Sequence, residues 1–548
     1  MDWVQDWGLT LATFLPALGA VVLLFVPSND RRGVRPRGGE TAEEPVGETA
    51  TVVHEEDHAD AHSYEPTSSD RMVLIVAAVF TGLALLAGIL SLIEFDFGAA
   101  GQIQLDVNLE WISQIDANYH IGVDGMSLPL LVLSVLVSFL CIVYLFFHIP
   151  PPGKVKALTA LILLLETGMN GSFIALDLIL FFIFWEIVLV PMYFMIGIWG
   201  GPRREYAAVK FFLYTLFGSI FMLLGFLALW FQTGTFDMIE LRELGAAGRI
   251  GSELFGTLVF AGLALGFAIK VPMWPFHTWL PDAHTEAPTV GSVLLAAILL
   301  KMGTYGFIRI ALPILPDAAV DFAPIIGILA VIAIIYGALC CFAQTDLKRL
   351  IAFSSVGHMG FVMLGISTLT DAGINGAIFG MVAHGLITGM LFFLAGSIHE
   401  RYHTREISEL GGMLQQIPRF GTLFTYAAIA SLGLPGLAGF WGEMLALFGS
   451  YQPHPALSEE LFRALMVGGG IGTVLTAGYL LWTIQRVNLG IPKEKFAGRT
   501  LGDVHPLEWM AWAPLLVLIL AAGVFPKLLL DLTDGAVQTL LGAFGAGG

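Results

Sequence analysis

Four charged side chains lie inside long apolar runs of the sequence. Glu186 stands in FFIFWEIVLVPMYF, Lys270 in ALGFAIKVPMWPFHTWLP, and Lys301 in SVLLAAILLKMGTYGF. Glu443 stands in LGLPGLAGFWGEMLAL. An ionisable side chain in the middle of a membrane costs about 2.5–3.5 kcal/mol or more, so such residues usually mark a functional path. Four of them, two of each sign, point to the movement of an ion or a proton.

The chemistry that these residues could carry is reversible proton binding. Burial and nearby charges both change the proton affinity of a carboxylate or an ammonium group. A Glu–Lys pair can therefore act as a switch, because a change at one partner alters the proton affinity of the other. Histidine side chains can in general gain and lose a proton near neutral pH, so His358 and His384 could link the charged sites through water. Glu166 is a weaker candidate of the same kind.

Structural roles stay open for these residues. The charges could pair only to hold helices together, and an intramembrane histidine often serves helix packing as a hydrogen-bond donor. Two of the charges stand beside helix breakers, because Pro272 and Pro275 follow Lys270, and Pro435 precedes Glu443. Broken helices at membrane depth are tolerated where they line a cavity. A simple kink for packing is the alternative.

The elements that must position these residues are membrane-spanning helices. The sequence predicts an all-α polytopic membrane protein with about 14 spans, since each segment can cross a bilayer core of about 30 Å. Spans 7 and 12 carry the breakers and are five apart, which favours two five-helix repeats, spans 4–8 and 9–13. Five is odd, so the repeats would lie inverted in the membrane. The spans are expected at 8–27, 72–93, 123–147, 155–175, 178–199, 207–232, 254–276, 289–312, 323–343, 350–370, 373–398, 420–449, 463–485 and 508–530.

The distribution of Lys and Arg predicts the orientation of the chain. If the N-terminus is outside, 19 of the 26 basic residues fall in cytoplasmic regions, as the positive-inside rule expects. Both termini are then outside. We expect the chain to have three parts. Residues 1–122 contain two spans, a cytoplasmic loop at 28–71 and an outside loop at 94–122. Residues 123–490 form the translocating core, and residues 491–548 form the last span and a short tail.

The two N-terminal loops differ in composition. The loop 28–71 holds 11 acidic and 5 basic residues without a periodic apolar face, so it is expected to remain a solvated linker. Its His54, His58 and His62 stand beside acids and leave metal binding open. The outside loop 94–122 mixes Phe, Ile, Val and Trp with Gly and Asp, which favours a short β-hairpin on the membrane surface.

Composition excludes several classes of protein. Charged residues are 13% and apolar residues 56% of the 548 positions, whereas soluble proteins have roughly 25% charged residues. The net charge of −18 without a basic stripe argues against nucleic-acid binding. Cys141, Cys340 and Cys341 lack metal-ligand spacing, so no disulfide framework, zinc site or iron–sulfur site is expected. The acidic start, Met1 to Trp7, favours a retained first span over a cleaved signal peptide.

Several runs of this sequence resemble the antiporter-like membrane subunits of respiratory complex I, the proton-pumping NADH:quinone oxidoreductase. The resemblance covers nearly the whole chain, from about residue 120 to 530. It implies a fourteen-helix core of two inverted five-helix repeats, each with a half-channel and one broken helix. The runs are FWEIVLVPMYFMIGIWGG, KVPMWPFHTWLPDAHTEAPT, FSSVGHMGF, HGLITGMLFFLAG and SLGLPGLAGFWGEM.

The resemblance implies proton-transfer roles for individual residues. Glu186 and Lys270 match the coupled pair of that family on spans 5 and 7. Lys301 matches its connecting lysine on span 8. His358 and His384 match positions on its central hydrophilic axis.

Glu443 matches an acid of that family on span 12, where the sister chains L and N place lysine. We expect it to act as an exit-side gate, because it stands beside the Pro435 break where the matched region of the first repeat carries Lys270. The loop 28–71 departs from the family pattern, and no family role can be carried onto it.

The resemblance also implies where cofactors and partners belong. No nucleotide, flavin or iron–sulfur motif occurs in this chain, so no cofactor is expected in it. NADH, FMN, iron–sulfur clusters and quinone would reside in partner subunits. The implied partners are chains L and N of the membrane arm and, through them, the peripheral arm, with the lipid bilayer around the spans.

The sequence therefore predicts a proton-translocating membrane-arm subunit of NADH:quinone oxidoreductase in the bacterial plasma membrane, an enzyme subunit without its own redox centre. Two other related complexes remain open as alternatives for this chain. One is a subunit of a Mrp-type cation/proton antiporter, which exchanges Na⁺ for H⁺ without redox coupling, and the other is a membrane-bound hydrogenase. A purely structural scaffold would explain the helices but not the four buried charges.

Overall fold

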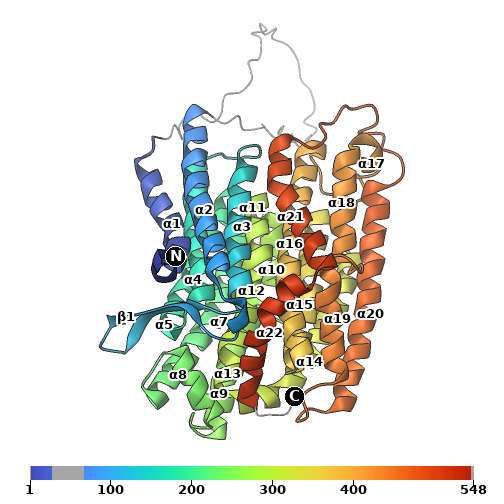
Figure 1. Ribbon diagram of the computed structural model, residues 1–548. Coiled ribbons are helices and arrows are strands. Elements are labelled where there is room, and N and C mark those ends of the chain that lie inside the picture. Colours follow the sequence, from blue (N-terminus) through green and yellow to red (C-terminus); the bar gives the residue numbers. More distant parts are fainter. Residues whose placement is uncertain (1, 28–66, 545–548) are drawn as a thin grey trace, which may run out of the picture.

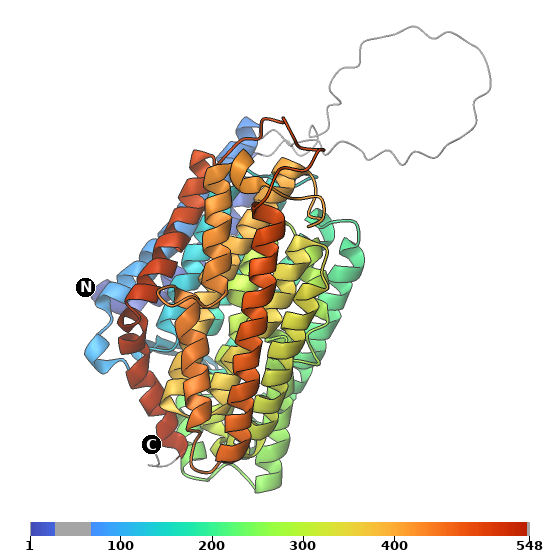
Figure 2. The ribbon, with the colours of Figure 1, turned by 90° about the vertical axis from the view of Figure 1, so that its right-hand side faces the viewer.

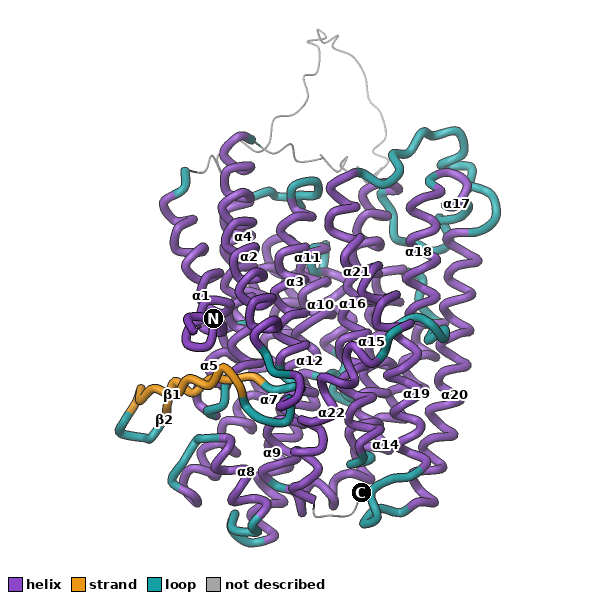
Figure 3. Tube along the Cα trace, in the orientation of Figure 1, coloured by secondary structure: helices purple, strands orange, loops and turns teal. Residues whose placement is uncertain are grey.

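The computed structural model describes residues 2–27 and 67–544. The chain forms a bundle of long helices that run side by side, with one β-hairpin projecting from the flank (Figures 1 and 3). The predictions for the acidic loop, including those for its three histidines, concern residues 28–66 and lie outside the described residues.

Thirteen helical segments of the described residues are long and apolar enough to cross a membrane. They correspond to thirteen of the predicted spans. The helices of these segments are α1 (Asp2–Phe25), α2 (Ser68–Glu94), α3 (Leu128–Leu145), α4 (Val155–Ile174), α5 (Leu178–Ile187) with α6 (Leu189–Trp199), α7 (Arg204–Thr233), α9 (Glu253–Lys270), α11 (Thr289–Leu294) with α12 (Leu300–Gly306) and α13 (Leu312–Ile314), α14 (Pro316–Phe342), α15 (Leu347–Ser367), α16 (Asp371–Tyr402), α20 (Glu459–Thr483) and α21 (Pro506–Val524).

The remaining predicted span, at 420–449, is a broken helix. Its halves are α18 (Pro418–Ser431) and α19 (Ala438–Tyr451), each 14 residues long and too short to cross a bilayer alone. Gly433 and Gly436 have φ values of 82° and 94°, a backbone conformation that glycine adopts without strain. Pro435 between them has no N–H group to continue the helix. The predicted break in span 12 is confirmed.

Span 7 is broken as well. Helix α9 ends at Lys270, and the chain forms turns until α10 (Trp279–Glu286) begins. Pro272 and Pro275 lie in this interval, where each removes a backbone donor. The predicted break beside Lys270 is therefore confirmed.

Two further spans are irregular in ways that the sequence analysis did not predict. Span 5 is interrupted between α5 and α6 at Val188. Pro191 explains the interruption, because its ring cannot coexist with a regular bond to the carbonyl of Ile187. Span 8 contains two π-helical turns, Leu295–Leu299 and Phe307–Ala311, on either side of α12. Such turns widen a helix locally and often occur at functional sites.

Two matching backbone bridges support the inverted repeat. Asp177 pairs with Asp237, and Asp346 pairs with Glu406, with the same separation along the chain. Asp177 caps the N-terminus of α5, whereas Asp346 caps that of α15. The helices that follow these bridges, α8 (Met238–Ala246) and α17 (Met413–Gln416), lie at opposite ends of the bundle (Figure 1). The two five-helix units therefore have opposite directions, as predicted.

The outside loop contains the predicted hairpin. Strands β1 (Gln104–Ile112) and β2 (Ala117–Val123) are antiparallel, with Asn108 opposite His120. They follow a single helical turn at Phe97–Ala99.

The C-terminal tail contains an additional helix, α22 (Lys527–Leu541), which the sequence analysis did not predict. Helix α22 packs on α16, where the Thr533 hydroxyl donates to Asn375 Oδ1 at 2.6 Å. Span 14 correspondingly ends at Val524 rather than at residue 530.

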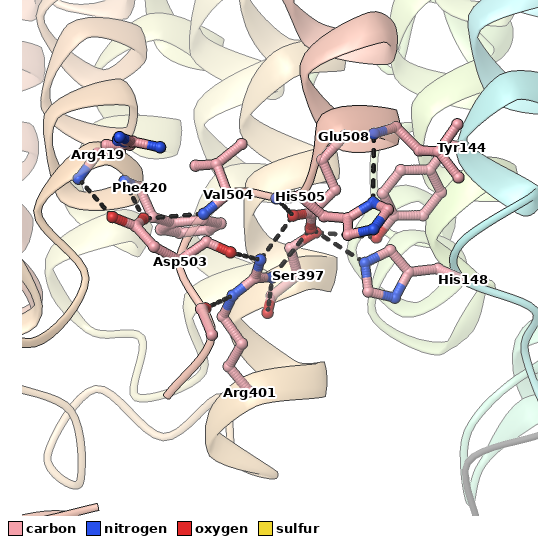
Figure 4. A network of polar contacts seen from close by, with 12 residues as sticks. Tyr144, His148, Ser397, Arg401, Arg419, Phe420, Asp503, Val504, His505 and Glu508 are labelled. Carbon is pink, nitrogen blue, oxygen red and sulfur yellow. Dashed lines mark hydrogen bonds and ion pairs between the residues drawn. The ribbon is translucent and has the colours of Figure 1, made fainter. Parts of the chain in front are cut away.

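A buried polar network fixes α21 to the rest of the bundle (Figure 4). The side chain of Glu508 is 0% exposed and accepts two bonds from Arg401 of α16, at 2.9 and 2.6 Å. His148, just after α3, lies 3.0 Å from the same carboxylate. Three separate helices are thus tied together at the end of the bundle that carries α17. The rotated ribbon shows the long helices running side by side along the bundle (Figure 2).

The distribution of buried surface distinguishes inner from outer helices. The apolar window of span 8 is 100% buried, whereas those of α2 and α7 are 39% buried and that of α20 is 33% buried. Outer faces carry large apolar side chains such as Phe231 and Val474, which are 78% and 71% exposed. Exposed apolar surface on this scale belongs in contact with lipid or with neighbouring membrane subunits.

One buried ion pair joins the end of β2 to span 8. Arg309 Nη2 lies 2.5 Å from Asp124 Oδ1, and both side chains are almost completely buried. We expect Asp124→Asn to destabilise the protein by about 3–5 kcal/mol, because it leaves the Arg309 charge buried without a counter-charge. The midpoint of thermal unfolding in detergent measures this loss. Asp116→Asn in the exposed hairpin turn is the matched control, and an equal effect of the two changes would disprove the structural role of the pair.

Candidate functional site

Four of the predicted site residues form a continuous line of contacts, here called the polar axis: Lys301, His384, His358 and Glu443. The Lys301 Nζ lies 2.6 Å from His384 Nδ1. The rings of His384 and His358 have centroids 5.7 Å apart. His358 Nδ1 lies 3.2 Å from Glu443 Oε1. The axis thus joins span 8 to spans 11, 10 and 12.

The backbone around Lys301 accounts for its position. Its ammonium donates to the carbonyl of Ala296 at 2.6 Å, within the first π-helical turn. Gly303 brings this helix close to the end of α9, since a Cβ atom there would lie 2.7 Å from Val271 Cγ2. The fully buried Lys301 is therefore held on a helix that presses against the segment just after Lys270.

The break in span 12 shapes the other end of the axis. Ser431, the last residue of α18, has its Oγ 3.0 Å from His358 Nε2. The Thr473 hydroxyl of α20 donates to Glu443 Oε2 at 3.5 Å. A Cβ atom on Gly433 would lie 3.2 Å from that same carboxylate oxygen, so glycine at the break leaves room for the Glu443 side chain.

Cavities lie on both sides of Glu443. A cavity of about 30 Å³ is lined by His384, His358, Ser431 and Glu443, which is room for one or two water molecules. A second cavity of about 360 Å³ is lined by Glu443 and Thr473 together with apolar side chains of α19 and α20. Glu443 therefore separates the interior of the axis from the outer face of these helices.

The first repeat contains two buried charged residues, Glu186 and Lys270, which do not contact each other directly. Among the described residues, Lys270 Nζ and Glu186 Oε1 are buried atoms without a hydrogen-bond partner. Lys270 Nζ lies 4.8 Å from the centroid of the Trp185 ring. Trp185 directly precedes Glu186 in the chain, so the two charges lie close together, although no ion pair joins them in the part of the chain that the structure describes. The structure thus places them in one region, apart from the contacts of the polar axis.

The structure corrects one detail of the predicted correspondence between the repeats. The sequence analysis placed Glu443 at the position that matches Lys270. Lys270 is the last residue before its break, whereas Glu443 lies in the half-helix after its break. The Glu443 carboxylate nevertheless returns to the break at Gly433. Each break therefore has a charged group beside it. In span 7 this group comes from the half-helix before the break, and in span 12 it comes from the half-helix after the break.

Two other titratable side chains, Glu166 and His284, are fully buried as well. Glu166 on α4 is 0% exposed, and neither of its carboxylate oxygens has a hydrogen-bond partner among the described residues. His284 on α10 is also 0% exposed and stacks on Phe392, with ring centroids 4.6 Å apart. Sequence reasoning missed His284 because it falls between two predicted spans, although its place after the Pro272 break was a usable signal.

Within 2–27 and 67–544, no group of three His, Cys, Asp or Glu side chains is arranged to hold a metal ion. Cys141, Cys340 and Cys341 are free thiols. The chemistry that this site can perform is the transfer of protons between carboxylate, imidazole, hydroxyl and ammonium groups.

The sequence is similar to known membrane proteins along most of its length. Residues 175–466 match the family described as NADH:quinone oxidoreductase/Mrp antiporter, TM. The NADH-quinone oxidoreductase subunit M of Rickettsia prowazekii is 40% identical over 475 residues, which are 86% of this chain and 93% of that protein. The subunit M of Rhodobacter capsulatus is 41% identical over 485 residues, covering 86% of this chain and 91% of that protein.

Solved structures share the fold. A chain of respiratory complex I from Thermus thermophilus with bound NADH has a TM-score of 0.80 at 26% identity, over 98% of this chain and 100% of that chain. A chain of the Mrp complex from Dietzia sp. DQ12-45-1b has a TM-score of 0.79 over 100% of both chains, but its identity of 19% shows the shared fold alone. On the strength of the sequence relatives, this chain belongs to the subunit M family of NADH-quinone oxidoreductase, respiratory complex I.

Proposed function

We propose that this chain moves protons through the membrane arm of complex I, driven by quinone reduction elsewhere in the complex. The observation that carries the proposal is the unbroken polar axis from Lys301 to Glu443. Each neighbouring pair on this axis can exchange a proton directly or through one water. The residues of the axis belong to span 8, the last helix of the first repeat, and to three helices of the second repeat.

The steps along the axis follow from its atoms. The Lys301 ammonium donates to His384 Nδ1, so a proton can pass to the ring as Lys301 becomes neutral. The other nitrogen of that ring, Nε2, has no partner among the described residues and can release a proton to water in the small cavity. His358 can take up that proton and pass it to the Glu443 carboxylate through its Nδ1 contact. Glu443 would then release it to the larger cavity.

Glu186 and Lys270 supply the switch in this proposal. Their charges interact without contact, so a change of charge on one alters the proton affinity of the other. Lys270 stands at the end of α9, against which the Lys301 helix packs. A change of charge at Lys270 would therefore reach Lys301 through the packing between these two helices.

The orientation follows the distribution of basic residues. The end of the bundle with α17 carries Arg401, Arg405 and Arg419, whereas the opposite end carries the chain terminus after α22 (Figure 1). Cytoplasmic placement of the basic end puts both termini outside, in a bacterial plasma membrane. The partners would be chains L and N and, through them, a peripheral arm that holds NADH, FMN, iron–sulfur clusters and quinone.

The assignment to a Mrp-type antiporter has weaker support than the assignment to complex I. The relatives with 40% and 41% identity are named as subunits M of NADH-quinone oxidoreductase. The likeness to the Mrp complex, at 19% identity, carries the fold and not the function. A Mrp-type antiporter would exchange Na⁺ for H⁺ without NADH, so assays of sodium exchange in vesicles distinguish the two.

The first of two predictions from this proposal concerns Glu443 as the exit-side gate. Glu443→Gln keeps the shape of the side chain but cannot ionise, so NADH-driven proton translocation should be lost. Glu443→Asp keeps the charge and should retain much of the activity, with some loss from its shorter reach to His358. Proton uptake by inverted vesicles measures both, with the exposed Glu460→Gln as the matched control. Equal activities of the Asp and Gln variants would falsify the gate and favour a packing role.

The second prediction concerns the charged pair of the first repeat. Glu186→Ala and Lys270→Ala should each abolish proton pumping while the complex remains assembled, because either change removes one partner of the switch. Native gel electrophoresis checks assembly, and a pH-sensitive dye in energised vesicles checks pumping. Near-normal pumping in both variants would show that the pair is structural.

A further inference from the structure

The base of the β-hairpin contains a histidine between two carboxylates. His120 of β2 has a side chain that is only 5% exposed. Its Nδ1 lies 2.6 Å from Asp237 Oδ2, and its Nε2 lies 2.9 Å from Asp106 Oδ1. Asp106 belongs to β1, on the same hairpin, whereas Asp237 is the residue that caps α8. The ring therefore joins the hairpin to the end of the helical bundle.

This geometry requires a particular protonation state. A neutral imidazole has one N–H donor and one acceptor nitrogen, whereas an ionised carboxylate can only accept. Both contacts can be hydrogen bonds to carboxylates only when the ring carries both protons. A single metal ion cannot take the place of the two ring protons, because the two ring nitrogens point in different directions. We propose that His120 is a proton-binding site whose occupancy latches the hairpin to α8.

Two carboxylates contact His120 and favour its protonated form: Asp106 on β1 and Asp237 at the start of α8. Asp177, at the start of α5, lies beside Asp237 through a backbone bridge. Asp177 Oδ2 accepts the backbone N–H of Asn118 on β2 at 3.0 Å, and the Leu176 N–H donates to the carbonyl of His120 at 2.9 Å. The latch thus lies where the hairpin meets the ends of spans 5 and 6.

The pKa directions agree with this geometry. Burial lowers the pKa of His120, but the hydrogen bonds and charges of Asp237 and Asp106 outweigh it and hold this pKa above its ordinary value. Burial has the opposite effect on Asp237 and raises its pKa. The hydrogen bond from His120 and the bonds from the α8 backbone outweigh it, so the pKa of Asp237 is below its ordinary value. Burial raises the pKa of Asp177.

The sign of the pH dependence follows. A group whose pKa is raised by folding contributes its full stabilisation below its unfolded pKa, here about 6.5. The contribution is lost as the pH rises through the raised value. The latch is therefore closed at acid pH and opens at alkaline pH. In the orientation proposed above, it responds to the pH outside the membrane, although the latch itself does not depend on that orientation.

Hydrogen exchange in the assembled complex, reconstituted in nanodiscs, tests the latch. Exchange of the hairpin amides 104–123 is followed by mass spectrometry from about pH 6 to 9 and corrected for intrinsic rates. The corrected rate should rise by roughly tenfold for each unit by which the pKa of His120 is raised. A corrected rate that does not change with pH would overturn the proposal.

Two variants separate a proton latch from a merely structural histidine. Asp106→Asn keeps an acceptor oxygen but removes one charge, so the hairpin should stay protected at acid pH while its transition moves to lower pH. His120→Gln should abolish the transition, whereas the control His454→Gln, on a loop away from the hairpin, should leave it unchanged. An unshifted transition in Asp106→Asn, or a wild-type transition in His120→Gln, would refute the latch.

Discussion

The four charged side chains of the candidate site each stand beside a break or a π-helical turn, and the site depends on this arrangement of the backbone. A continuous helix bonds its N–H groups internally, so it offers a buried charge little more than the second lone pair of a carbonyl. Lys301 is accommodated because a π-helical turn lets it reach the Ala296 carbonyl. Lys270 stands where α9 ends, and the Glu443 carboxylate lies against the break at Gly433. Glu186 lies next to the interruption before Pro191. Each charge thus occurs with an irregular backbone.

The two repeats bring these irregular segments together in one bundle. Spans 4–8 and 9–13 have opposite directions, as the paired bridges at Asp177 and Asp346 indicate, so their broken helices are inverted relative to each other. Lys301 stands on the completely buried span 8 and contacts His384 of the second repeat. A lysine at that boundary is suited to pass charge changes from one repeat to the other. The Glu508 network ties span 11 of the second repeat to span 14 and to the end of span 3.

Much of this arrangement could be predicted from the sequence, for identifiable reasons. Hydrophobic length predicts the spans, and Pro272, Pro275 and Pro435 predict the breaks in spans 7 and 12, since these signals act locally. Pro191 is an equally local signal for the break in span 5. The π-helical turns around Lys301 leave no mark in composition, and α22 follows an apolar run that resembles the end of a span. The order of contacts from Lys301 to Glu443 depends on which helices pack together, and residue spacing does not contain that information.

The central claim is that the polar axis carries protons and does not merely hold helices together. Its most direct test is the number of protons moved per NADH oxidised by complexes with Lys301→Met in sealed proteoliposomes. Methionine preserves the length and apolar stem of the side chain but removes the ammonium that contacts His384. The account predicts an assembled complex whose proton translocation through this subunit is lost, seen as a lower ratio or as blocked turnover. A wild-type ratio at wild-type turnover would contradict it.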